Sequence, residues 1–254
     1  MDSYKTDLAY IHDTGFGDFA KNCAPGLLEL LHSNEITGGL VIDLGCGSGI
    51  WASELSRRGY DVLGIDISEA MIDLARERAP NAEFRTGSLL SAELPSCVAV
   101  TSLGECINYL FDETNNMKQL RRLFRRVYSA LRPGGLFIFD IAVPGRGKGP
   151  SQKHREGSDW AVLVDVAENR RTKRLTRRII TFRRIGSLFR RDEEVHELQL
   201  YTRSEVLKEL RAAGFRARTL DRYGDQPMIE GCVAFVATAT RKRTQRVGAV
   251  GRHS

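Results

Sequence analysis

The sequence predicts an α/β fold in which helices cover both faces of a doubly wound, mostly parallel sheet. Segments of strand and helix character alternate between residues 39 and 141, which is the order that parallel sheets require. One segment, residues 97–103, is apolar almost throughout, as expected for a strand buried on both faces. The pattern changes after residue 144 and predicts an antiparallel β-meander inserted after the fifth strand.

The first forty residues predict helices that precede the sheet. Glycines interrupt the segment 6–20, so we expect that helix to be broken. Pro25 suits the first turn of the next helix, which carries a leucine-rich face. The first strand begins at about residue 39 and runs into a glycine-rich turn, and a helix follows over about residues 51–58.

Cap and turn residues define the elements that follow. Ser68 is a good N-cap, Pro80 stops the helix behind it, and Pro133 opens the turn into the fifth strand. On these signals and on apolar periodicity, we expect strands at 62–66, 82–86, 97–103 and 136–141, and helices at 68–79 and 113–131.

The second half of the chain has a different composition. Gly145–Gly157 is rich in Gly, Lys, Arg and Ser, which predicts a mobile loop, and residues 202–205 match a capping box that opens a helix. We expect meander strands at Trp160–Glu168, Arg174–Arg184 and Glu193–Tyr201, a helix ending at Gly214, and a last strand at Cys232–Thr238.

At 254 residues the chain predicts one domain, with an insertion, rather than two. We expect this domain to span residues 1–240 and a basic, disordered tail to occupy 241–254. Its expected parts are a helical lid (1–37), a ligand-binding core (38–143), the inserted loop and meander (144–201), and a C-terminal helix with strands (202–240).

Composition and charge exclude several classes of protein. There is no run of 18 apolar residues and no secretory leader, so we expect a cytoplasmic protein without a membrane partner. The five cysteines are scattered without a C-x-x-C pair, so we expect neither a disulfide framework nor a metal site. The net charge of +6 permits a nucleic-acid partner without establishing one.

The most informative segment is VIDLGCGSG at residues 41–49, followed by Asp66 at the end of the next strand. Glycines permit a turn with close ligand approach, and a carboxylate after the second strand can bind a ribose diol, so a nucleoside-binding βαβ unit is predicted. A dinucleotide fingerprint would need glycine where Ile50 stands, and a P-loop would need Gly-Lys-Ser/Thr. Asp43 would also repel a pyrophosphate.

A carboxylate at position 43 favours a cationic ligand, and S-adenosylmethionine carries a sulfonium and an ammonium group without a phosphate. On this motif, residues 38–143 resemble the class I S-adenosylmethionine-dependent methyltransferases. The resemblance implies a seven-stranded Rossmann-like sheet and S-adenosylmethionine as the cofactor. It also implies that Asp43, Gly45 and Gly47 hold the methionine end and that Asp66 binds the ribose hydroxyls.

The same resemblance assigns the other residues at this edge of the sheet. Ile67 and Met71 would pack on the adenine, and Ser88 and Leu89 would contact its edge, although many family members carry an acidic residue where Ser88 stands. The remaining members of the implied cofactor site are Cys46, Gly49, Gly87, Leu103 and Gly104.

Residues 103–109 follow the fourth strand, where the methyl group should emerge, and resemble the corresponding loop of small-molecule N-methyltransferases. The chain lacks the [DNS]-P-P-[YF] sequence of adenine methyltransferases and the Pro-Cys pair of RNA cytosine-5 enzymes. We therefore expect a small-molecule N- or O-acceptor and no nucleic-acid partner. An RNA or protein methyltransferase and a non-catalytic donor-binding protein are the alternatives, and the oligomeric state is left open.

Three residues are candidates for orienting the acceptor or accepting its proton. Glu105 follows the fourth strand, His12 lies in the N-terminal segment, and His196 lies on the last meander strand. Each also has a purely structural interpretation, as a charged helix end for Glu105 and as ordinary packing for the histidines. Because side chains alternate along a strand, His196 and Tyr201 should point to opposite faces.

Overall fold

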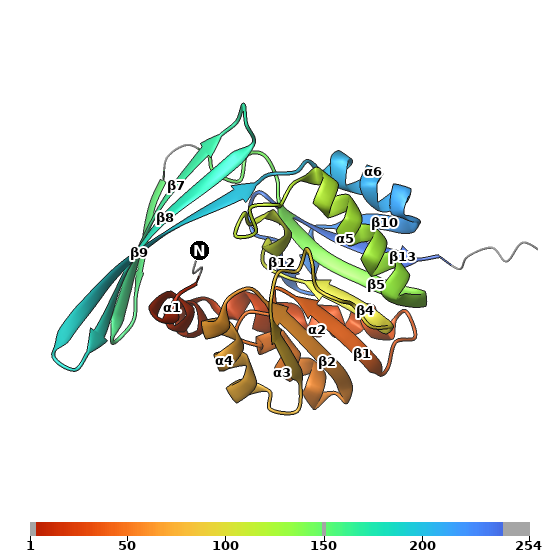
Figure 1. The fold of residues 1–254 in the computed structure, drawn as a ribbon, viewed down its shortest axis with the longest axis horizontal. Coiled ribbons are helices and arrows are strands. Elements are labelled where there is room, and N and C mark those ends of the chain that lie inside the picture. The colour runs from red at the N-terminus through yellow and green to blue at the C-terminus, as the bar shows by residue number, and fades with distance from the viewer. Residues whose placement is uncertain (1–3, 149–150, 241–254) are drawn as a thin grey trace, which may run out of the picture.

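The computed structural model describes residues 4–148 and 151–240, and its main element is a seven-stranded sheet with the order β10-β13-β5-β4-β1-β2-β3 (Figure 1). The five strands from β3 to β5 pair in parallel, β13 pairs antiparallel with β5, and β10 at the edge pairs antiparallel with β13. The strands are β1 (Gly39–Leu44), β2 (Tyr60–Asp66), β3 (Glu83–Thr86), β4 (Cys97–Ser102), β5 (Leu131–Ala142), β10 (Phe215–Leu220) and β13 (Cys232–Ala239). The predicted doubly wound, mostly parallel fold is confirmed.

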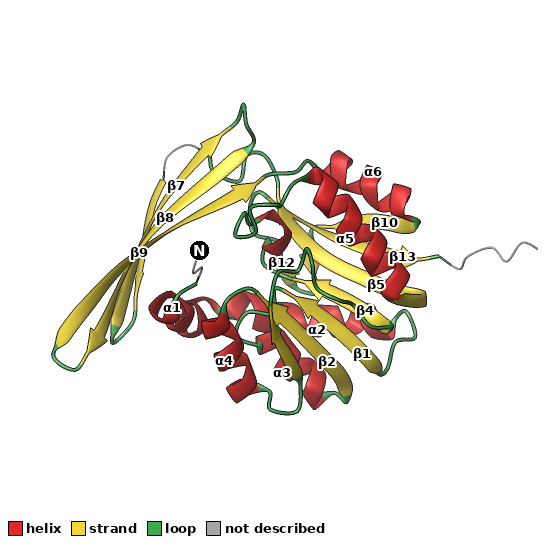
Figure 2. Cartoon of the chain, in the orientation of Figure 1, coloured by secondary structure: helices red, strands yellow, loops and turns green. Residues whose placement is uncertain are grey.

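Helices cover both faces of this sheet (Figure 2). One buried cluster joins α2, α3 and α4 to one face through residues such as Leu27, Trp51 and Ile72. A second cluster joins α5 and α6 to the other face through residues such as Phe124 and Leu210. The helices are α1 (Thr6–Phe16), α2 (Asp18–His32), α3 (Ile50–Arg57), α4 (Glu69–Arg78), α5 (Met117–Ala130) and α6 (Arg203–Ala213), with a 3-10 turn η1 (Cys106–Asn108). Burial of alternate strand residues on two faces makes this a three-layer fold.

The inserted segment forms a second, four-stranded antiparallel sheet beside the first, with α1 close to both (Figure 1). Its strands are β6 (Ser151–Glu156), β7 (Trp160–Asn169), β8 (Arg174–Ile185) and β9 (Leu188–Gln199). The backbone of Leu110 donates to the carbonyl of Glu197, which ties β9 to the loop after β4. A short β11 (Arg222–Tyr223) and β12 (Gln226–Pro227) pair near α2.

Several expected boundaries were wrong. The helix α2 begins at Asp18, so Pro25 lies in its interior and removes one backbone hydrogen bond. The expected loop at 145–157 contains β6, which makes the meander four-stranded. The helix α5 starts at Met117 and not near residue 113, because the side chain of Asn116 accepts from the N–H groups of its first turn.

Two further features complete the description. The fifth strand begins at Leu131, before the Pro-Gly-Gly segment, and its pairing with β4 shifts register between Cys97 and Ala99. Within the described ranges, none of the helices combines the length and apolar character needed to cross a membrane. The expected basic tail at 241–254 lies outside the described residues.

Candidate functional site

The carboxyl ends of β1, β2 and β4 meet at one edge of the sheet. The helix after β1 packs on one face, whereas the helix after β4 packs on the other, so the chain diverges between these two neighbouring strands. Doubly wound sheets bind ligands in the crevice at such a point. The predicted cofactor residues that line a cavity there are Gly45, Gly47, Asp66, Ile67, Met71, Gly87, Ser88, Leu89, Leu103 and Gly104.

The glycines after β1 have distinct tasks. Gly45 has a φ of +74°, and a Cβ there would lie 2.5 Å from Sγ of Cys106, so the turn can approach the loop after β4 only without a side chain. Gly49 has a φ of +73°, and a Cβ there would lie 2.9 Å from Cβ of Ala75. The structure therefore gives Gly49 a packing task between α3 and α4, and this residue does not line the crevice.

Two carboxylates, buried Asp43 and half-buried Asp66, lie at this edge without a cationic partner among the described residues. Asp43 is 2% exposed, and its Oδ1 accepts from the Thr101 hydroxyl at 2.7 Å. Asp66 accepts from the N–H groups of Gly47 and Ser68, both at 2.9 Å. Burial raises the pKa of Asp43 to about 7 and also raises the pKa of Asp66. Uncompensated carboxylates in such an environment fit a ligand that carries hydroxyl groups and positive charge.

The opposite end of the crevice is mostly apolar, with Ile67, Met71 and Leu89 in its wall. Ser88 donates its hydroxyl to Oδ2 of Asp112 at 2.5 Å, and Asp112 also lines the crevice. The acidic group that Ser88 lacks is therefore present on a residue that the sequence analysis missed. No local pattern links Asp112 to the crevice, because it lies 24 residues away in an irregular loop.

A larger cavity of about 850 Å³ lies between the two sheets and opens from the same crevice. Asp43 and Cys46, the other predicted cofactor residues, lie in its wall. Several residues line both spaces, among them Tyr4, His12, Gly104 and Tyr109. The side chains of these residues can therefore contact both a ligand in the crevice and a ligand in the cavity.

The helix α1 covers this shared wall. Asp13 accepts from the Ser48 hydroxyl at 2.5 Å and from Arg78 at 2.9 Å, which ties α1 to the glycine turn and to α4. His12 lies on the same helix and meets the ring of Tyr4 edge to face. Burial lowers the pKa of His12 to about 4, so its imidazole is neutral at pH 7.

His196 lies on β9 and is 1% exposed, against the rings of Tyr4 and Phe111. Its Nε2 is 2.9 Å from Oε2 of Glu194, and its Nδ1 has no hydrogen-bond partner within the described part of the chain. In the neutral imidazole the tautomer that donates from Nε2 to the Glu194 carboxylate leaves the Nδ1 lone pair free. The strand β9 ends at Gln199 and not at Tyr201 as expected, so alternation does not govern Tyr201, which packs in the core beneath α5 and α6.

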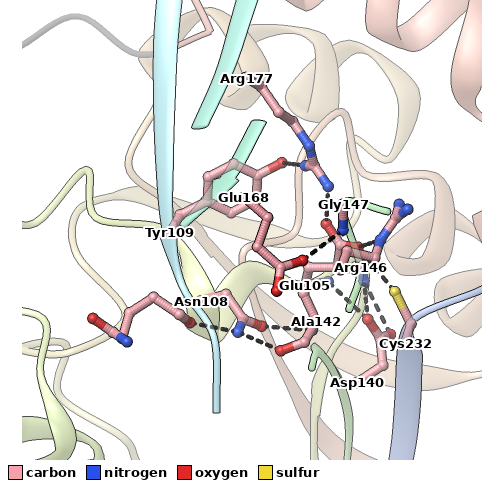
Figure 3. A network of polar contacts seen from close by, with 12 residues as sticks. Glu105, Asn108, Tyr109, Asp140, Ala142, Arg146, Gly147, Glu168, Arg177 and Cys232 are labelled. Carbon is pink, nitrogen blue, oxygen red and sulfur yellow. Dashed lines mark hydrogen bonds and ion pairs between the residues drawn. The ribbon is translucent and has the colours of Figure 1, made fainter. Parts of the chain in front are cut away.

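Glu105 differs from the expectation for a proton acceptor. Its Oε1 is 2.6 Å from Nε of Arg146, and its Oε2 is 2.5 Å from Nη2 of Arg177, as Figure 3 shows. Burial acts to raise its pKa, but the two guanidinium charges outweigh burial and lower the pKa to about 2. Such a carboxylate stays ionised at neutral pH and is a poor base, so the proton-accepting role expected for Glu105 does not fit this geometry.

The sequence analysis also missed Asp140, which is 1% exposed on β5. Its carboxylate accepts from the N–H groups of Gly104 at 3.0 Å and Glu105 at 2.7 Å (Figure 3). Burial raises its pKa to about 7. These bonds hold the loop after β4 against the sheet, including Glu105, whose φ of +64° is uncommon for a residue with a side chain.

Comparisons with known proteins agree with this geometry. Residues 41–135 match the model of a methyltransferase domain. The magnesium-protoporphyrin O-methyltransferase of Rhodobacter capsulatus is 33% identical over 103 residues, covering 39% of this chain and 45% of that protein. The 18S rRNA (guanine-N(7))-methyltransferase of Mus musculus is 25% identical over 175 residues, covering 65% of this chain and 62% of that protein.

The chain thus spans less than two thirds of these curated relatives. Among solved structures, the sugar N-methyltransferase KedS8 from Streptoalloteichus sp. ATCC 53650 has the same fold, with a TM-score of 0.78 and 19% identity over 95% of this chain and 96% of that one. Residues 41–135 thus match a methyltransferase domain, and the chain has the fold found in S-adenosylmethionine-dependent methyltransferases.

Proposed function

We propose that this protein transfers a methyl group from S-adenosylmethionine, bound in the crevice, to a nitrogen or oxygen atom of a small molecule in the larger cavity. The observation that carries this proposal is the wall that the crevice and the cavity share, around Gly104 and Tyr109. Because the two spaces adjoin at these residues, a donor in the crevice and an acceptor in the cavity would be in contact there. A cavity of about 850 Å³ is in the range of small-molecule sites.

The bound cofactor supplies a methyl group that is already activated by the sulfonium, so the protein's own contribution is to position the acceptor and exclude water. The residues of the crevice would hold the donor and those of the cavity would hold the acceptor, so that the two ligands come together around Gly104 and Tyr109. A protonated acceptor must also lose a proton. We assign that proton to Nδ1 of His196, with Glu194 fixing the tautomer.

The test begins with binding of S-adenosylhomocysteine by titration calorimetry. A panel of amines, phenols and alcohols is then incubated with S-adenosylmethionine, and formation of S-adenosylhomocysteine is measured by mass spectrometry. Donor binding with turnover on a member of the panel supports the proposal. Donor binding without turnover on any acceptor supports instead a non-catalytic S-adenosylmethionine-binding protein.

The relative that methylates 18S rRNA favours an RNA acceptor as the second candidate. Several meander arginines that could contact RNA are paired with carboxylates, as Arg174 is with Glu197 and Arg178 is with Glu193. These pairs leave less free positive charge than the sequence suggests. RNA binding that weakens steeply with salt would favour the RNA candidate over the small-molecule one.

Replacing Asp66 by alanine should weaken donor binding by about 1.5–3 kcal/mol, the usual range for hydrogen bonds to a charged group. The reason is that Asp66 is the half-buried acceptor available to the ribose hydroxyls at the end of β2. Titration calorimetry with S-adenosylhomocysteine measures the change, and Asp61→Ala on the same strand, at an exposed position, is the control. Equal affinities of Asp66→Ala and wild type would contradict the assignment.

Replacing His196 by glutamine should lower turnover about 100-fold or more with an acceptor that must lose a proton, and should leave donor affinity unchanged. Glutamine keeps a polar side chain next to Glu194 but offers no base. Turnover is measured with the best acceptor of the panel, and His32→Gln, at the exposed end of α2, is the control. Undiminished turnover in His196→Gln would remove His196 from the mechanism.

A further inference from the structure

The larger cavity contains a buried ion cluster with one positive charge in excess. Arg146 and Arg177 have side chains only 17% and 15% exposed, and both pair with the single carboxylate of Glu105. Nη1 of Arg177 donates a hydrogen bond to the hydroxyl of Tyr109 at 2.8 Å. Arg146 uses only Nε, and its Nη1 and Nη2 make no hydrogen bond to the described residues. Figure 3 shows these two nitrogens pointing away from Glu105.

The guanidinium of Arg146 therefore has two nitrogens that can still donate hydrogen bonds inside the cavity. Arginine presents its N–H groups as a planar fork that matches a carboxylate or phosphate with two parallel bonds. The Nε of Arg146 already takes part in the pair with Glu105, so the remaining edge is available to a second anion. An anion there would also balance the excess charge of the two arginines.

The strand β6, at the edge of the meander, adds positive charge to the same cavity. Lys153 lines the cavity and forms no ion pair within the described part of the chain. Arg155 lies 4.0 Å from Asp18, a weak pair, and lies over the ring of Phe16. The carboxylates of Asp43 and Asp140 lie instead at the strand ends next to the crevice. Glu230 and Asp18 also line the cavity and pair with Lys148 and Arg155, so the unpaired positive charge in the described lining lies at Arg146 and Lys153.

Part of the cavity wall beside these basic residues is apolar. The residues that form this part come from α1 and from the inner face of the meander: Leu8, Val162, Val164, Leu175 and Ile179. An apolar wall that ends in a basic patch suits a molecule of the same pattern, because each part of such a ligand finds a matching surface.

Resting on the proposed function, we propose that the methyl acceptor is an amphipathic acid, whose apolar body contacts the meander and whose carboxylate or phosphate group binds the free edge of Arg146 with support from Lys153. The atom that receives the methyl group then lies next to Tyr109 and His196, which line the same cavity. Carboxylate and phosphate share the required chemistry, and the two are separated by experiment.

The experiment uses the full chain saturated with S-adenosylhomocysteine and measures binding by titration calorimetry. The probes are 4-phenylbutyrate, phenethyl phosphate and the neutral 4-phenylbutyramide. At least one anion should bind about tenfold or more tightly than the amide, as expected for charged hydrogen bonds. The tighter of the two anions then identifies the group. Equal affinity for the amide, or no binding of either anion, would overturn the proposal.

Arg146→Gln should abolish the preference for anions, whereas Arg184→Gln, an exposed arginine on β8 outside the cavity, should retain it. Because Arg146→Gln also disturbs a buried ion cluster, its fold is checked by S-adenosylhomocysteine affinity and thermal unfolding. If that variant does not fold, Lys153→Gln, which breaks no ion pair in the described residues, should reduce the preference a few-fold. An unchanged preference in a folded Arg146→Gln, or in Lys153→Gln, would count against the proposal. Loss of S-adenosylhomocysteine binding in the wild type would instead refute the proposed function.

Discussion

Replacing Glu105 by alanine is expected to lower the free energy of unfolding by about 3–5 kcal/mol, the range for breaking a buried ion pair. The carboxylate is 5% exposed and lies between Arg146 and Arg177. Its removal would leave two guanidinium groups in a sheltered site without a counter-ion. The thiol of Cys232 donates to the same carboxylate at 2.9 Å. The empty space that the alanine leaves beside this thiol would lower the free energy of unfolding further.

The measurement is denaturant unfolding at pH 7, with Glu197→Ala as the matched control. Glu197 also pairs with an arginine of β8, but both side chains are about half exposed, so its loss should cost far less. The lowered pKa of Glu105 also predicts how the stability difference depends on pH. The stabilisation is present above pH 4.5 and is lost as pH falls toward 2, so the difference between Glu105→Ala and wild type should shrink in acid. Equal losses in the two variants at pH 7 would mean that the buried cluster stabilises the fold no more than an exposed ion pair does.

The donor crevice could be predicted because its residues lie in one short stretch of sequence. Asp43, Gly45, Gly47 and Asp66 belong to a single βαβ unit, so local spacing alone brings them to one edge of the sheet. The partners that modify their chemistry come from distant segments. Asp140 lies on β5, and its contact with the loop after β4 depends on the pairing of these two strands. Sequence spacing carries no information on such contacts.

The acceptor side was harder to predict for a different reason. Strand β6 is an edge strand with mostly exposed polar side chains, so it lacks the apolar alternation that marks a strand, and its composition is typical of a loop. Glu105 was identified as a candidate because a carboxylate follows β4. Its two arginine partners lie 41 and 72 residues away, and they change it from a base into the centre of an ion cluster.

Binding of S-adenosylmethionine should become tighter by up to about tenfold per pH unit as pH rises from about 5 to 7, and should level off above that. Burial raises the pKa of Asp43 to about 7, so below pH 7 this carboxyl group carries a proton when no ligand is bound. A cation beside it favours the ionised form, and binding must therefore release the proton. Calorimetry in two buffers that differ in ionisation enthalpy counts the protons released.

Two variants assign the effect. Asp43→Asn cannot ionise and should bind with little dependence on pH, whereas Asp140→Asn tests the other carboxyl group whose pKa is about 7. In the unliganded protein the same shift acts on folding with the opposite sign: Asp43 has a raised pKa when folded, so its contribution to stability falls as pH rises from 3.8 to about 7. Ligand affinity and unliganded stability should therefore change in opposite directions across this range. Affinity that is flat between pH 5 and 7, with no proton released, would show that no cation is bound beside Asp43.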